Sequence, residues 1–128
     1  MLFPWVLTDY TGHSIFAATA EKMYDYLPLS AITAKTTAMY GANAQLIFAT
    51  QQAKNLILKW WVLCALEKNC MKPPGRYSLY CDFQGKTYDR YANCHRYDQS
   101  ALNILLLNEA ENLTLYTDRF PLDIIRSA

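Results

Sequence analysis

The sequence has few glycines, almost no net charge and no long apolar run. It contains four glycines in 128 residues, and none of them forms a glycine-rich phosphate-binding loop. Twelve basic residues nearly balance eleven acidic ones, which argues against a nucleic-acid partner because phosphate neutralisation needs a basic surplus. The longest apolar stretch, 56–66, contains Lys59 and is too short to span a bilayer. We therefore expect no membrane segment in this chain, and leave open a membrane anchor elsewhere in a longer parent.

The start of the chain lacks a cationic segment followed by a sustained apolar one, as a signal peptide would have. Residues 1–7 are apolar, but Asp9 ends this stretch, so we expect no signal peptide here. Sequence typical of the middle of a domain follows Met1 directly, so we expect Met1 to be an internal or truncated start. The composition, 52% hydrophobic and 14% aromatic, supplies ample apolar surface to offset the entropy of folding. The length of 128 residues suits one domain, spanning 1–128.

Four cysteines, Cys64, Cys70, Cys81 and Cys94, form an even set that permits two disulfides in any of three connectivities. Their spacing does not suit a structural zinc site, which prefers closely paired ligands. Buried reduced thiols in a cytosolic protein are the alternative. Asn112 begins an acceptor pattern for N-glycosylation. Together the cysteines and this pattern favour the secretory pathway, in the Golgi lumen or outside the cell.

The Pro-Pro-Gly cluster at 73–75 separates two halves of the domain, because prolines lack an amide donor and glycine allows a sharp reversal. Hydrophobic patterning predicts the elements of each half. In the first half we expect strands at 14–19 and 45–50 and a helix from 51 to about 68 with Thr50 as its N-cap. In the second half we expect a strand at 78–83, an exposed loop at 85–93, a helix over 99–108 with Asp98 as its N-cap, and a last strand at 113–117.

Both expected helices carry apolar residues on nearly every side, so each needs cover on more than one face. The few expected strands are too small to provide that cover. We therefore expect an α/β domain that is incomplete, with part of the parent domain missing.

Reactive side chains are densest at His95, Arg96, Asp98 and Gln99, where an irregular segment enters the second helix. Free backbone amides at a helix entrance favour anionic groups of a ligand. A structural alternative stands beside this interpretation: Asp98 only caps the helix, His95 and Arg96 are surface groups, and Asn103 hydrogen-bonds nearby backbone.

Three segments carry a resemblance to a known family: CHRYDQSALN at 94–103, MYGANAQ at 39–45 and WWVLCALE at 60–67. Over residues 12–116 the chain resembles the C-terminal part of an uncharacterised, nematode-expanded family of glycosyltransferase-like secretory proteins. The wider similarity is to GT-A glycosyltransferases. It implies the acceptor-side, C-terminal portion of a GT-A-like nucleotide-diphospho-sugar transferase fold.

The resemblance also implies roles for individual residues. Asp98 and Gln99 match the start of a DQD triplet, so Asp98 would hydrogen-bond donor-sugar hydroxyls and Gln99 would lie near the anomeric carbon. His95, Arg96 and Asn43 would contribute to substrate binding. The implied partners of the parent protein are a nucleotide-sugar donor and a glycan or protein acceptor.

Two departures from the GT-A pattern limit this expectation. Ser100 stands where the triplet has its last aspartate, and the chain contains no DxD motif. DxD carboxylates hold the divalent ion that neutralises the leaving diphosphate. We therefore expect a metal such as Mn²⁺ only in the full-length parent, no metal site in this chain, and no sugar transfer by this chain alone. A non-catalytic lumenal glycan-binding or scaffold module is the alternative function.

Overall fold

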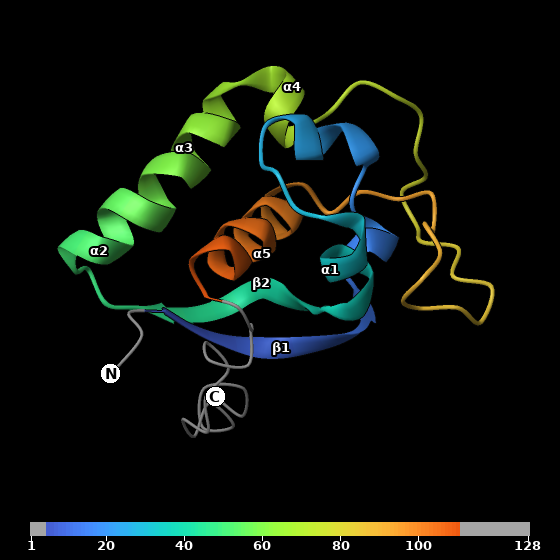
Figure 1. Ribbon diagram of the computed structural model, residues 1–128, viewed down its shortest axis with the longest axis horizontal. Coiled ribbons are helices and arrows are strands. Elements are labelled where there is room, and N and C mark those ends of the chain that lie inside the picture. Colours follow the sequence, from blue (N-terminus) through green and yellow to red (C-terminus); the bar gives the residue numbers. More distant parts are fainter. Residues whose placement is uncertain (1–4, 111–128) are drawn as a thin grey trace.

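Two long strands form the floor of the structure, a computed structural model that describes residues 5–110 (Figure 1). Strand β1 (Trp5–Ser14) pairs antiparallel with β2 (Ala38–Ile47), and Tyr10 lies opposite Tyr40 in the register. The register shifts twice along the pair, and Gly41 approaches the Asp9 side chain so closely that a Cβ there would lie 3.0 Å from it. This two-stranded antiparallel sheet, together with the helices described below, makes a mixed α/β fold.

Short helical segments connect the two strands. They are the 3₁₀ turns η1 (Phe16–Ala18) and η2 (Glu21–Asp25), followed by α1 (Ala31–Thr36). The expected strand at 14–19 is therefore wrong: only Ser14 belongs to a strand, and the 3₁₀ turn η1 that follows turns the chain away from the sheet. The strand expected at 45–50 overlaps the end of β2 and stops at Ile47.

After β2 the chain forms one long helical segment, as the apolar pattern predicts. It consists of α2 (Gln51–Ala53), a π-helical turn η3 (Lys54–Leu58) and α3 (Lys59–Leu66), followed by the short α4 (Lys68–Met71). Thr50 is the N-cap, as predicted, since its hydroxyl accepts the Ala53 N–H at 3.0 Å.

Residues 72–96 form an irregular loop without a regular strand. The expected strand at 78–83 is wrong: this segment makes only an isolated bridge between Ser78 and Cys94. Residues 85–93 form the predicted loop, although Ala92 within it is buried. The strand expected at 113–117 and the glycosylation pattern at Asn112 lie outside the described residues.

The core lies around α5 (Tyr97–Glu109), which packs between the sheet and the α2–α3 helix (Figure 1). Every residue of α5 from Ser100 to Leu107 is buried, so both the sheet and α3 cover it. The opposite side of α3 has no such cover from residues 5–110, and Trp60, Val62 and Leu66 of this helix are exposed. The expectation of all-round cover thus holds for α5 and fails for α3.

The four cysteines form two disulfides, Cys64–Cys70 and Cys81–Cys94. The first ties the end of α3 to α4, and the second ties the loop to the segment that enters α5. Disulfides persist in oxidising compartments, so the pairing is typical of a secreted protein and argues against four reduced thiols. None of the helices within residues 5–110 is long and apolar enough to cross a membrane.

Candidate functional site

The entrance of α5 lies where the sequence predicts the site, but the helix begins earlier than expected. Tyr97 is its first residue and Arg96 occupies the N-cap position, without a side-chain capping bond. The prediction that Asp98 is the N-cap is wrong, because Asp98 lies within the first turn. Tyr97 has a φ of 38°, in the left-handed region that an aromatic residue rarely adopts. This backbone conformation turns the chain into the helix in place of an N-capping side chain.

His95 is a buried structural residue and not the surface group of the structural alternative. Its Nδ1 accepts the Ala20 N–H at 3.0 Å, and its Nε2 lies 3.0 Å from the Met71 carbonyl. Since one nitrogen faces a donor and the other an acceptor, these contacts select the neutral tautomer with the proton on Nε2. Burial lowers the pKa of His95, which also favours the neutral ring. His95 thereby joins η2 and α4 to the entrance of α5.

Asn103 bonds to the backbone of β2, as the structural alternative predicts. Its Oδ1 accepts the Tyr40 N–H at 2.8 Å, and its Nδ2 donates to the Tyr40 carbonyl at 2.8 Å and to the Gln99 carbonyl at 2.8 Å. Its side chain thus provides Tyr40 with the pair of bonds that a further strand would provide. The amide is fully buried, so these bonds hold α5 against the sheet.

The side chains of Gln99 and Ser100 also form hydrogen bonds with the backbone of other segments. The Gln99 Oε1 accepts the Ala42 N–H at 3.3 Å. The Ser100 hydroxyl donates to the Ala18 carbonyl at 3.1 Å and accepts from the Thr19 hydroxyl at 2.9 Å. Much of the CHRYDQSALN segment therefore stabilises the fold. Gln99 can offer a ligand only the hydrogen-bonding capacity of its amide that the fold does not already use.

A shallow pocket of about 240 Å³ opens beside these residues, and it brings together four of the five predicted site residues. It is lined by Ser78, Leu79, His95, Arg96, Tyr97, Asp98 and Gln99. Arg96 and Asp98 are exposed, and their side chains make no hydrogen bond or ion pair within residues 5–110. We call this hollow the α5 pocket.

The aromatic wall of the α5 pocket was not anticipated from the sequence. Tyr97 lies edge-on to the His95 ring at 5.0 Å and to the Tyr77 ring at 6.2 Å between centroids. Burial raises the pKa of Tyr77, with Tyr97 as a further cause. The position of Tyr97 between Arg96 and Asp98 could have indicated an aromatic wall, but its strained backbone could not be inferred from the sequence.

Asn43, the fifth predicted site residue, lies on β2 outside the lining of the α5 pocket. Its Nδ2 donates to Asp9 across the strand pair at 3.2 Å. The neighbouring Ala42 bonds Gln99, so Asn43 reaches the α5 pocket only through the backbone of β2.

Within residues 5–110 no three or more His, Cys, Asp or Glu side chains converge in a group that could hold a metal ion. Comparison with family models, with curated proteins and with solved structures gives no match for this chain. The resemblance to glycosyltransferase-like proteins therefore stays a prediction.

Proposed function

We propose that this chain is a non-catalytic glycan-binding module of the secretory pathway, in the Golgi lumen or outside the cell, and that the α5 pocket holds one sugar ring. The observation that carries the proposal is the exposed pair Arg96 and Asp98 on a rigid frame. A guanidinium and a carboxylate can hydrogen-bond neighbouring sugar hydroxyls in a fixed plane, and such charged bonds are about twice as strong as neutral ones. Tyr97 adds an aromatic surface that is 39% exposed.

The size of the α5 pocket supports a sugar ring over a nucleotide sugar. At about 240 Å³ it is smaller than most small-molecule sites, which span roughly 300–1,000 Å³. The two disulfides are consistent with the lumenal location.

The catalytic alternative is that the chain is the acceptor-side portion of a GT-A-like transferase. What favours it is the order of Asp98 and Gln99 at the opening of α5, with the Asp98 carboxylate exposed. It requires nucleotide- and metal-binding groups beyond those described. In that case Asp98 orients the donor sugar, and exchanging its carboxylate for an amide removes most transfer in the full-length parent.

The experiment titrates the folded chain with a panel of methyl glycosides and short oligosaccharides, monitored by NMR and calorimetry. Asp98→Asn and Arg96→Gln should each weaken binding about tenfold or more, because a hydrogen bond to a charged group contributes roughly 1.5–3 kcal/mol. The exposed residues Asp89 and Arg76 lie outside the pocket lining, so Asp89→Asn and Arg76→Gln are matched controls.

A parallel assay with nucleotide sugars and Mn²⁺ tests the catalytic alternative in the parent protein. Saturable binding that is lost in the two pocket variants supports the module. Binding that is equal in all four variants, or absent from the whole panel, overturns it. Sugar turnover that depends on Asp98 in the parent would establish the transferase instead.

A further inference from the structure

A second hollow lies away from the α5 pocket, between η1, η2, α1 and the loop. It has a volume of about 420 Å³, within the roughly 300–1,000 Å³ of typical small-molecule sites. Its walls combine aromatic rings with carboxylates. We call it the η2 pocket.

Three aromatic side chains from three separate segments line the η2 pocket: Phe16, Tyr24 and Tyr91. Aromatic ring faces carry partial negative charge and attract cations, most strongly where water is excluded. The Phe16 ring already contacts one cation, since the Lys35 ammonium is 4.7 Å from the ring centroid.

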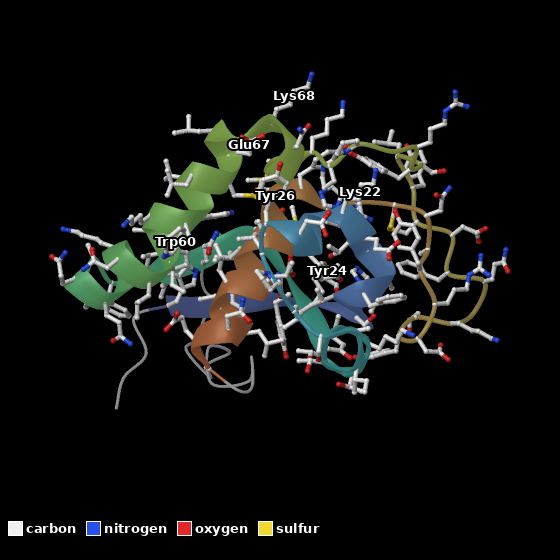
Figure 2. All side chains as sticks on the ribbon, turned by 45° about the horizontal axis from the view of Figure 1, so that its top comes forward. Lys22, Tyr24, Tyr26, Trp60, Glu67 and Lys68 are labelled. Atoms are coloured by element: carbon white, nitrogen blue, oxygen red, sulfur yellow. A yellow bond between two sulfur atoms is a disulfide. The ribbon has the colours of Figure 1, made fainter. Side chains whose placement is uncertain are left out.

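Two carboxylates give the η2 pocket its charge. Glu21 and Asp25 both line it from η2, and neither makes a hydrogen bond or ion pair within the described part of the chain. The cations nearby are Lys22, on the same helix as Tyr24 (Figure 2), and Lys35 on α1. The carboxylates line the hollow itself, whereas Lys22 and Lys35 are outside its lining.

Tyr24 contributes a neutral wall with an unused hydroxyl. The hydroxyl oxygen is buried and has no hydrogen-bond partner within the described residues. Burial raises the pKa of Tyr24 to about 12, and the nearby Thr19 opposes that shift in part. Tyr24 therefore remains an uncharged phenol at neutral pH.

We propose that the η2 pocket binds a small organic cation with an apolar body, of the alkylammonium or quaternary ammonium type. The two carboxylates exclude anions. A hard metal ion prefers six or more oxygen ligands and water over aromatic walls, which these side chains do not provide. An alkylated ammonium carries a delocalised, weakly hydrated charge, so it loses little hydration free energy when it leaves water. In the pocket it gains attractive contacts with both the carboxylates and the aromatic ring faces.

The test uses choline and its uncharged isostere 3,3-dimethylbutan-1-ol, which has the same shape without the positive charge. Both are titrated into the folded chain by NMR. Choline should bind in a saturable manner. The isostere should bind at least about tenfold more weakly, because it lacks the positive charge that the ring faces and carboxylates attract.

Substitutions of the lining residues test whether choline binds in the η2 pocket. Glu21→Gln with Asp25→Asn should weaken choline binding about tenfold or more without weakening the isostere. Asp89→Asn, outside the pocket, is the control and should leave binding unchanged. Lys35→Gln should strengthen choline binding, because it removes the competing cation from the Phe16 ring. Melting temperatures confirm that each variant is folded.

Equal binding of choline and its isostere, or choline binding that survives the double substitution in a folded protein, overturns the proposal. The absence of any saturable choline binding overturns it as well. None of these outcomes bears on the α5 pocket, which is tested with sugars.

Discussion

At the scale of single residues, Asn103 is the clearest case of a polar side chain that organises an apolar core. Replacing it with Leu removes three hydrogen bonds, two of them to the backbone of Tyr40. We expect Asn103→Leu to destabilise the fold by about 3 kcal/mol or more, since unpaired buried groups each cost about 1–3 kcal/mol. Urea unfolding measures the loss.

The exposed Asn108 donates a single bond to the Pro28 carbonyl, so Asn108→Ala is the matched control. It should cost less than about 1 kcal/mol. If Asn103→Leu proved as mild as Asn108→Ala, the hydrogen bonds between α5 and β2 would not stabilise the fold as we argue.

Tyr97 permits a test of backbone strain. At its φ of 38° a side chain is disfavoured, so Tyr97→Gly should be about 1–2 kcal/mol more stable than Tyr97→Ala. At Ala101, inside α5, the order should reverse, with Gly about 1 kcal/mol less stable than Ala. Thermal or urea unfolding of the variants measures the order of stability at each position. The same order at both positions would contradict the strained geometry.

The two histidines make stability depend on pH. Burial lowers the pKa of His95, and burial also lowers the pKa of His13, whose Nδ1–H donates to the Ser14 carbonyl. A group whose folded pKa lies below its ordinary value of about 6.5 stabilises the fold fully above that pH. Its contribution is lost as the pH falls towards the folded pKa, because the unfolded chain takes up the proton first.

We therefore expect the melting temperature to decrease between pH 7.5 and 5.5, above the range where carboxylates titrate. His95→Gln should flatten part of this decrease, and His13→Gln another part. A wild-type melting temperature that stays constant over this range would show that neither ring is held neutral.

The candidate site was predictable at this scale only where its residues are neighbours in the sequence. His95, Arg96, Asp98 and Gln99 line one pocket because they are contiguous. The partners that fix His95 are Ala20 and Met71, which are separated from it by 75 and 24 residues, and no local pattern signals them. The η2 pocket draws on η1, η2, α1 and the loop, so it could not be foreseen either.

At the scale of elements, the helices followed from apolar patterning more closely than the strands did. A helix is stabilised by contacts within a few residues, and 51–66 and 97–109 are close to the predicted ranges. Strand β1 was not predicted, because its pairing with β2 joins segments some 30 residues apart and leaves little local trace. Asp98 was misassigned as a cap because the strained Tyr97 starts the helix earlier.

The two disulfides should contribute unequally to stability. Cys81–Cys94 has a sequence separation of 13 and Cys64–Cys70 one of 6, so the first closes the longer loop. Replacing both cysteines with serine should cost about 3 kcal/mol for the first pair and about 2 kcal/mol for the second. Urea unfolding gives both values. The reverse order would mean that native contacts, and not loop closure, dominate the two bridges.

At the scale of the whole molecule, one apolar face is left uncovered by the other residues of the 5–110 segment. It comprises Val62 and Leu66 on α3, together with Trp60 and Leu63, which line a small hollow between α3 and Tyr26. An exposed apolar patch of this kind promotes association. We expect concentration-dependent self-association of the wild type that Val62→Lys with Leu66→Lys reduces.

Sedimentation velocity over a concentration series measures the association. Because both residues are exposed, the double substitution should change the free energy of unfolding by no more than about 1 kcal/mol. Ile32→Lys, on the exposed side of α1, is the control and should leave association unchanged. A wild type that sediments as a monomer at every concentration would contradict the expectation.

The π-helical turn at Lys54–Leu58 fixes the rotational phase of everything that follows it in this helix. If the same five residues were wound as a regular α-helix, without the extra residue that the π turn accommodates, the side chains of α3 would rotate by about 100° relative to α2. Trp61, whose indole donates to the Asp98 carbonyl at 3.0 Å, would then turn away from the entrance of α5. The π turn, some forty positions before the α5 pocket, therefore keeps a support of that pocket in place without contributing any side chain that lines it.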